Sequence, residues 1–395
     1  MVEGKGKLVI DLGNSETRVG VQFGKNATLG TPRSRIRTLS NGYSAIQESA
    51  ISILMSSGNY DEKTSRVFKI GEGYYCNGEI ADTEYGMSIT RPSALIQKYK
   101  SAETMKAVAN ALCQGIMEVA DMNGAELDDI NVSWDVFVLL PPGHIEERVH
   151  TDTGTVSGAE FLARHIKALN EINFLLPKLH VDVDIESVTV FPEGHCAFMA
   201  VLFEHKGKIR EGYKDLVTSP TIIIDIGAGT SDICVVENGK TIINTRHTAN
   251  YGGNNVHAKV ADLLKADGIQ LYDSDVRKGT VSGYVMDGAK KVRIERKIDI
   301  AKQQVANLLV NDIQRFFEAQ GYPPQKLAKL LVCGGGAEKA ESEKIIPLGN
   351  YIDHYMKQLS PNIENVEYPE VEINGEMVQI SPRLLNIYGA MILAE

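Results

Sequence analysis

Paired cysteines and long apolar runs are both missing from this sequence. The chain has 395 residues, and its five cysteines and nine histidines are scattered without a Cys-x-x-Cys pair, so neither a disulfide framework nor a zinc site is expected. No apolar run approaches the ~20 residues that a membrane-spanning helix needs, and no signal-peptide core follows the N-terminus. These absences indicate a cytoplasmic protein whose thiols are reduced and mostly buried.

Positive charge is scarce as well. The chain has 41 Lys and Arg residues against 51 Asp and Glu residues, which gives a net charge of −10. Bare nucleic acid and anionic membranes are both bound through clusters of Lys and Arg, so direct contact with either is not expected. The remaining composition is that of a globular protein, with 43% hydrophobic residues, and the length suits two or three domains.

Alternation and helical spacing predict the elements of two halves. In the first half we expect a strand–turn–strand unit over 7–23, a strand-like piece over 50–54, a helix over 102–119, a buried strand over 136–140, a helix over 158–176 and a strand over 181–191. In the second half we expect a strand–turn–strand unit over 221–236, a helix over 254–265, an irregular stretch over 268–297, a helix over 299–319, a strand over 330–333 and a buried helix over 384–393.

One four-residue motif occurs in both halves. Ile10–Gly13 reads Ile-Asp-Leu-Gly and Ile224–Gly227 reads Ile-Asp-Ile-Gly, and each motif is followed by a polar turn that leads into a strand. A carboxylate at the end of a buried strand is costly unless it is paired or binds a cation. Two such carboxylates, Asp11 and Asp225, would repel each other unless a hard cation lay between them, and Mg²⁺ takes this place together with its waters and phosphate oxygens.

The turns after these aspartates suit a polyphosphate. Small residues and successive backbone N–H groups make concave anion sites, and the turns consist of Gly13, Asn14 and Ser15 in the first half and Gly227, Ala228, Gly229 and Thr230 in the second. A flat backbone surface for a nucleobase or ribose is expected where glycines follow one another. Such runs are Gly334, Gly335 and Gly336, and, as a weaker example, Gly252 and Gly253.

In their order along the chain, five segments resemble the signature segments of the actin-like ATPase superfamily. Along the chain they are the first phosphate segment at Ile10–Gly20, the first connecting segment at Phe137–Gly143, the second phosphate segment at Ile222–Val235, the adenosine segment at Leu330–Glu338 and the second connecting helix at Ser381–Ala394. Within the superfamily the sequence looks most similar to the bacterial ParM-type plasmid-partition actins, because Pro192–Glu193 precedes the second phosphate segment as it does in that family.

The resemblance implies an actin-like (ribonuclease H-like) α/β fold with two related domains and an ATP cleft between them. It places domain I at 1–218 with an outer subdomain at about 31–105, domain II at 219–379 with an outer subdomain at about 255–300, and a helix at 380–395 that returns to domain I. It also implies that Asp11 and Asp225 hold Mg²⁺ through water and that Glu193 orients the attacking water. Arg18 stands where many relatives have a lysine that reaches phosphate.

The implied function is polymerisation driven by ATP, with GTP as the alternative nucleotide, coupled to hydrolysis in the bacterial cytoplasm. The filament would move plasmid DNA through a DNA-binding adaptor protein, so the chain's own partners would be further copies of itself and that adaptor. Other readings are a small-molecule kinase of the same superfamily, a chaperone-type ATPase, and another prokaryotic cytoskeletal actin.

Overall fold

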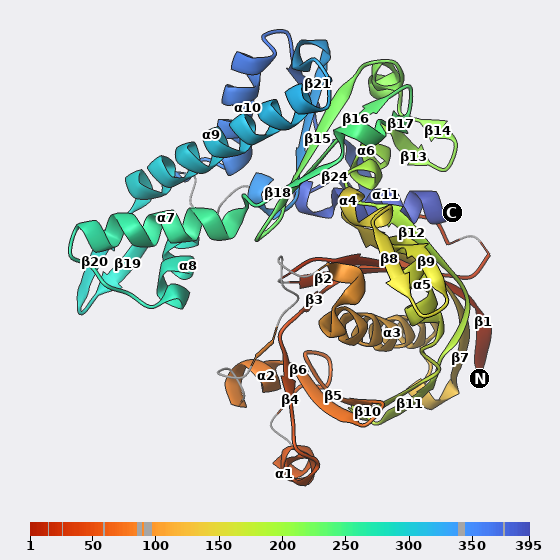
Figure 1. Cartoon of the computed structure of the whole chain (residues 1–395). Coiled ribbons are helices and arrows are strands. Elements are labelled where there is room, and N and C mark those ends of the chain that lie inside the picture. The colour runs from red at the N-terminus through yellow and green to blue at the C-terminus, as the bar shows by residue number, and fades with distance from the viewer. Residues whose placement is uncertain are drawn as a thin grey trace.

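The computed structural model describes the chain except for Ser15, Asn26 and residues 58–59, 85–88, 91–96, 339–343 and 374–375. It has two lobes, each built around a mixed sheet, and helices α6 (His195–Leu202) and α11 (Leu385–Ala394) lie between the two sheets (Figure 1).

The first half contains a five-stranded sheet in the order β12-β7-β1-β2-β3. Its strands are β12 (Asp184–Pro192), β7 (Ile130–Leu140), β1 (Val2–Leu12), β2 (Glu16–Phe23) and β3 (Ser34–Ser40). The hairpin of β1 and β2 is antiparallel, whereas β7 runs parallel to both β1 and β12. The first strand–turn–strand unit is therefore confirmed.

A second sheet covers the other side of the long helix α3 (Ala102–Asn123), so that this helix is packed between two sheets (Figure 1). The order of its strands is β11-β10-β5-β6-β4. The elements of this outer layer are β4 (Tyr43–Ala45), α1 (Glu48–Ser57), β5 (Ser65–Ile70), β6 (Gly73–Gly78), α2 (Glu79–Glu84), β10 (Glu171–Leu176) and β11 (Leu179–Asp182). The outer layer thus combines two separate stretches of sequence.

The second half repeats the hairpin at its centre. Its sheet has the order β17-β16-β15-β21-β22, and β18 (His247–Ala249) pairs with β16. The other strands are β15 (Thr221–Ile226), β16 (Ser231–Glu237), β17 (Lys240–Thr241), β21 (Lys329–Cys333) and β22 (Glu364–Asn365). The outer face is covered by α7 (Gly253–Ala266), α9 (Glu295–Ala319) and α10 (Leu348–Leu359), and α8 (Asp273–Ser282) with the hairpin β19 (Tyr284–Asp287) and β20 (Lys290–Arg293) extends beyond it.

Short elements complete the described chain. The helical ones are η2 (Lys98–Lys100), η3 (Leu127–Asp129), α4 (Pro142–Ile145), α5 (Gly158–Lys167), η4 (Glu211–Val217), η5 (Ile243–Thr245), η6 (Pro324–Lys326), η7 (Gly335–Ala337) and η8 (Pro382–Leu384). The strands form the hairpins β8 (Arg148–Thr151) with β9 (Gly154–Ser157), β13 (Phe203–His205) with β14 (Lys208–Ile209), and β23 (Glu370–Ile373) with β24 (Glu376–Gln379).

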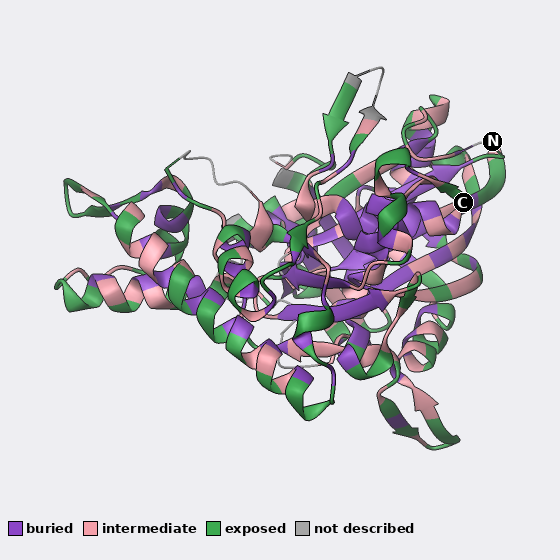
Figure 2. Cartoon of the chain, turned by 90° about the horizontal axis from the view of Figure 1, so that it is seen from above, coloured by how far each residue is buried: buried purple, intermediate pink, exposed green. Residues whose placement is uncertain are grey.

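Strand alternation determines which side chains enter the layer between the two sheets. On β1, Leu8 and Ile10 belong to the core around α3, whereas Val9 packs with α6 and α11. On β15, Ile224 faces α7 and α9, whereas Ile223 packs with α6 and α11. Successive side chains on a strand point to opposite faces, so Asp11 and Asp225 both lie on the faces that meet at α6 and α11. Figure 2 shows this central layer as the most continuously buried part of the molecule.

Three of the predicted elements are wrong in type or extent. Residues 50–54 lie in helix α1, where Ile51 and Leu54 pack inward and Ile53 is exposed, a helical spacing that a short apolar run does not reveal. The helix expected over 158–176 ends at Lys167, and residues 171–176 form β10 with alternating burial. The stretch over 268–297 is α8 followed by the β19–β20 hairpin.

All five cysteines are buried, as expected, and none of them takes part in a disulfide. Within the ranges described above, no helix has both the length and the apolar character to cross a bilayer.

The crossing of α6 and α11 depends on Gly389. A Cβ at this position would collide with the carbonyl oxygen of Cys196 on α6. We expect Gly389→Ala to lower the free energy of unfolding by about 1–3 kcal/mol. The added methyl group would overpack the contact between the two helices, and the helices cannot move apart without disrupting the central layer. Thermal unfolding would measure this loss. Gly212→Ala is the matched control, because Gly212 is exposed and has no atom near the added methyl group; equal melting temperatures for both variants would contradict the argument.

Candidate functional site

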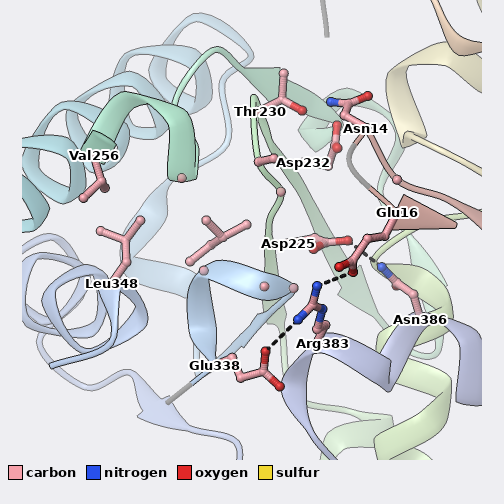
Figure 3. A pocket seen from close by; sticks show the side chains of 18 of the residues that line it. Asn14, Glu16, Asp225, Thr230, Asp232, Val256, Glu338, Leu348, Arg383 and Asn386 are labelled. Atoms are coloured by element: carbon pink, nitrogen blue, oxygen red, sulfur yellow. Dashed lines mark hydrogen bonds and ion pairs between the residues drawn. The ribbon is translucent and has the colours of Figure 1, made fainter. Parts of the chain in front are cut away.

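A cavity of about 520 Å³ lies between the two halves. The first half contributes side chains and turns from β1, β2, η2 and the end of β12: Asp11, Gly13, Asn14, Glu16, Arg18, Lys98 and Glu193. The second half and the C-terminal segment contribute Asp225, Ile226, Gly227, Ala228, Thr230, Asp232, Gly253, Val256, His257, Thr280, Val281, Lys302, Gly334, Gly335, Gly336, Glu338, Leu348, Arg383 and Asn386. Figure 3 shows polar side chains from both halves facing this space.

Each hairpin places two charged side chains opposite each other. In the first half, Asp11 is the cross-strand partner of Arg18, whose Nη1 donates to Asp11 Oδ2 at 2.9 Å. In the second half, Asp225 is the cross-strand partner of Asp232. The spacing of seven residues is the same in both hairpins, but the second residue is a cation in one and a carboxylate in the other. The first hairpin therefore neutralises its own aspartate and the second does not.

Glu193 lies between β12 and α6 and is 4% exposed. Its Oε1 accepts a hydrogen bond of 2.7 Å from Lys98 Nζ on η2. Its backbone is fixed by a hydrogen bond from Glu193 N–H to the carbonyl oxygen of Leu140 at the end of β7. Sequence reasoning found Glu193 but not Lys98, because the two residues are far apart in the chain and no motif contains Lys98.

Three of these carboxyl groups are poorly compensated. Burial, reinforced by repulsion from Asp11 and Asp232, raises the pKa of Asp225 to about 7. Burial, with repulsion from Glu193, raises the pKa of Asp232 to about 7, and burial raises the pKa of Glu193 to about 7 although Lys98 opposes the shift. Because these groups hold protons more tightly in the folded chain, the free energy of unfolding falls as the pH rises toward and through about 7 when no cation is bound.

This charge arrangement fits a divalent cation. No group of three or more His, Cys, Asp or Glu side chains in the described ranges is arranged to hold a metal ion, so an ion near Asp11 and Asp225 would need further oxygen ligands from water and phosphate. Mg²⁺ binds in this manner, through one or two carboxylates with waters and substrate phosphates. The donor set is therefore suitable for Mg²⁺ that arrives with a nucleotide.

The second turn is packed against the start of a helix. Gly227 N–H donates to the carbonyl oxygen of Thr230 at 2.9 Å and closes the turn. The N–H groups of Gly253 and Asn254, in the first turn of α7, donate to the carbonyl oxygens of Gly227 and Ala228 at 3.0 and 2.7 Å. The positive end of a 14-residue helix thus lies against the turn, which favours an anion there.

Glycine is required at several of the predicted backbone surfaces. Gly334 has φ +83°, and a Cβ there would collide with Asp225 Oδ1. A Cβ on Gly336 would collide with the side chain of Ile226, whereas Gly335 has open space beside it. A Cβ on Gly252 would lie 2.7 Å from the carbonyl oxygen of Gly227. These glycines let the chain follow the end of β15 closely.

The C-terminal segment joins both halves of the site. Asn386 Oδ1 accepts from the N–H of Gly194, 2.9 Å away, and its Nδ2 donates to Asp225 Oδ2. Arg383 forms ion pairs with Glu16 of the first hairpin and with Glu338 beyond the glycine run (Figure 3). Neither residue was expected to line the site, since the segment was predicted only as a buried helix that connects back to the first half.

The outer end of the cavity has a different character. Val256, Val281 and Leu348 give it an apolar lining, and Val256 and Leu348 are seen at its far side in Figure 3. His257 and Lys302 also line the cavity, and burial lowers their pKa values to about 4 and about 8. This end suits a flat, largely neutral ring system.

The structure brings most of the predicted site residues to the same cavity. Those that line it are Asp11, Gly13, Asn14, Arg18, Glu193, Asp225, Gly227, Ala228, Thr230, Gly253, Gly334, Gly335 and Gly336. Gly229 and Gly252 do not line it and instead shape the turn and the start of α7. Ser15 lies outside the described residues. Their roles toward a ligand stay predictions.

Comparisons with known proteins point to one fold. The family described as archaeal actin homologue MreB-like, C-terminal, matches residues 223–343. The crystal structure of an archaeal actin homologue, Ta0583, in complex with ADP covers 98% of this chain and 97% of its own, with a TM-score of 0.60 at 16% identity. The chain has the actin-like fold.

Two further structures agree with this. Actin-like protein Alp7A is similar over 100% of this chain and 96% of its own, with a TM-score of 0.65 at 15% identity. A 15-stranded ParM filament from Clostridium botulinum is similar over 99% of both chains, with a TM-score of 0.60 at 14% identity. No curated protein matches the sequence significantly. The expected fold class is confirmed, and the resemblance to the actin-like superfamily is confirmed at the level of the fold.

Asn386 provides a test of how the site is held together. In Asn386→Asp, a second carboxyl group would face Asp225. Below pH 6 a shared proton can replace the amide hydrogen bond, whereas above about 7, where Asp225 ionises, two carboxylates repel each other. We expect a small loss of stability at pH 5 and a loss on the order of 2–4 kcal/mol at pH 8, measured by urea unfolding. Asn311→Asp, on the exposed side of α9, is the control, and a pH-independent loss in Asn386→Asp would contradict the geometry.

Proposed function

We propose that this protein is an ATP-dependent filament-forming protein that hydrolyses ATP on polymerisation. The observation that carries the proposal is the pairing of Asp11 with Asp225 across one cavity, each at the end of a buried strand and followed by a glycine turn. Two turns that face each other grip a polyphosphate from both sides. The similarity to structures described as filaments of ParM supports assembly.

In this proposal, Asp11 and Asp225 hold Mg²⁺ through water, and the bound ion neutralises charge that develops on the phosphates. The turns at 13–15 and 227–230 bind the β- and γ-phosphates with backbone N–H groups. Glu193 orients the attacking water in line with the γ-phosphate. Catalysis then consists mainly of positioning and charge neutralisation, as is general for phosphoryl transfer.

The nucleoside would lie toward the second half. Gly335 offers an open backbone surface, and Gly252 brings α7 against the second phosphate turn. The apolar outer end at Val256 and Leu348 would cover the base. We propose ATP as the nucleotide, with GTP as the alternative that a direct affinity comparison would decide. The similarity to a structure described as a complex with ADP supports a nucleotide as the ligand.

We further propose that the filament acts in the bacterial cytoplasm and moves plasmid DNA. The net charge of −10 makes direct DNA binding unfavourable, so the proposal assigns that contact to an adaptor protein. It also keeps the domain boundaries at 1–218, 219–379 and 380–395, with outer subdomains near 31–105 and 255–300.

Light scattering and pelleting test the function. With Mg²⁺ and ATP, we expect scattering and pelleted protein to rise and then to decay as phosphate is released, because hydrolysis would weaken the filament. Without nucleotide, or with EDTA, neither should rise. No assembly over a wide range of concentrations while ATP still binds would favour a small-molecule kinase, which phosphorylation of a metabolite panel would identify.

Glu193→Gln separates assembly from hydrolysis. We expect phosphate release to fall by about 10²–10⁴-fold, since a positioned base contributes about this much, while nucleotide binding and assembly persist and the filaments last longer. Phosphate release and pelleting on the same samples measure both. Glu186→Gln on the same strand β12 is the control, because Glu186 is exposed and pairs with Lys5. Hydrolysis at the parent rate in Glu193→Gln would remove the assignment.

A further inference from the structure

We propose that Lys98 is a positioning residue for hydrolysis: it holds Glu193 in its charged, water-orienting geometry. This inference rests on the proposed function and extends it to a residue outside the recognised segments. Its basis is the 2.7 Å contact between Lys98 Nζ and Glu193 Oε1, with both side chains lining the cavity and 11% and 5% exposed.

The backbone of Lys98 is firmly held. Its carbonyl oxygen accepts from Thr104 Oγ1, in the first turn of α3, at 2.6 Å. The next residue, Tyr99, is 3% exposed and packs edge-on against His144 and Phe161. A long, flexible lysine side chain therefore starts from a fixed point, which is what precise placement of a partner requires.

A role in stability alone does not account for this pair. Burying a lysine and a glutamate together costs desolvation that their attraction barely offsets, so apolar residues of similar volume are often at least as stable. Here the pair faces a cavity rather than a packed core, and the charge is kept: burial lowers the pKa of Lys98, but attraction to Glu193 and Asp232 outweighs it and the net shift is upward.

The charges around Glu193 come from several elements. Lys98 on η2 is the cation beside it, whereas Asp11 on β1 and Asp225 on β15 repel it. Asp232 on β16 adds a further carboxylate that Glu193 itself repels. Without the lysine, all of these influences, and burial, would favour the protonated form of Glu193, which cannot act as a base toward the attacking water.

Lys98 also interacts electrostatically with carboxylates from both halves. Lys98 and Glu193 belong to the first half, and Asp232 belongs to the second, where its other partner is the hydroxyl of Thr248 on β18. Attraction between Lys98 and Asp232 grows as the halves approach. Lys98 is thus attracted by carboxylates of both halves, and its contact with Glu193 is already formed in this structure.

The main rival role is direct binding of the γ-phosphate by Lys98. The two roles differ in what a neutral replacement changes. Loss of a phosphate ligand weakens nucleotide binding, whereas loss of a positioning residue leaves binding nearly intact, slows the chemical step and changes its dependence on pH.

The experiment compares Lys98→Met, Lys98→Arg and the parent. Nucleotide affinity is measured by titration with Mg²⁺, and phosphate release from assembled protein is measured in a single turnover from pH 6 to pH 9. For Lys98→Met we expect affinity within about threefold of the parent, release at pH 7 slowed by about tenfold or more, and an acidic limb of the profile displaced by about one pH unit toward alkaline pH. Lys98→Arg, which keeps the charge, should restore most of the rate.

Two controls make the result specific. Lys106→Met, on α3, removes a lysine that is similarly buried, at 12% exposed, and ion-paired with Glu103 outside the cavity, and it should leave the profile unchanged. In the background of Glu193→Gln, Lys98→Met should have no further effect on release, because the group through which it acts is gone.

The outcomes separate the possibilities. A profile for Lys98→Met that is lower but has the parent's midpoint, or an additive effect with Glu193→Gln, would overturn the positioning role. A loss of affinity of more than about tenfold with an unshifted profile would establish a phosphate ligand instead. If Lys98→Met does not fold, Lys98→Arg decides alone: retention of rate and midpoint supports the role, and a loss as large as that of Glu193→Gln refutes it. No release by the parent protein would refute the proposed function itself, and this inference with it.

Discussion

Four carboxylates buried around one cavity are the constraint on which the rest of this structure depends. Asp11, Glu193, Asp225 and Asp232 are each at most 8% exposed, and only Arg18 and Lys98 form ion pairs with any of them among the described residues. Such a cluster is tolerable only when protons or cations compensate it. The raised pKa values of three of these groups result from the same excess of buried negative charge. Protons compensate these groups at low pH, and the proposed Mg²⁺ would compensate them when it is bound with its nucleotide.

The two hairpins solve this problem differently although they share one geometry. In the first, the arginine opposite Asp11 supplies the compensating charge within the hairpin itself. In the second, Asp232 stands at the corresponding position, so compensation comes from outside the hairpin, through Asn386 on Asp225 and through the attraction of Lys98 toward Asp232. The second hairpin therefore depends on the first half and on the C-terminal helix. The hairpin is repeated with a carboxylate in place of the arginine, and this single change of charge makes the two halves interdependent.

What the sequence could reveal follows from the range of the interactions. The sequence revealed the two aspartates, their turns and the glycine run because each belongs to a short local motif, in which a strand ends and a turn of small residues begins. Lys98, Asp232, Arg383 and Asn386 were not, because their roles arise from contacts between distant segments such as Lys98 with Glu193 or Asn386 with Gly194. The error at 50–54 has the same origin: a short apolar run fits strand and helix alike until its packing partner is known.

The contacts that join the two halves are stronger deep in the interior than at the mouth of the cavity. Asn386 is 6% exposed and forms both of its hydrogen bonds in the interior, where α11 lies against α6 at Gly389. The ion pairs of Arg383 with Glu16 and Glu338 involve side chains that are 31–38% exposed, and partly solvated pairs of this kind contribute only about 0–1 kcal/mol each. The halves can therefore separate at the mouth of the cavity at small cost while the central helices stay packed. A molecule held firmly at the base and weakly at the rim is expected to open by rotation about that base, and this is the motion by which the proposed nucleotide would enter the cavity.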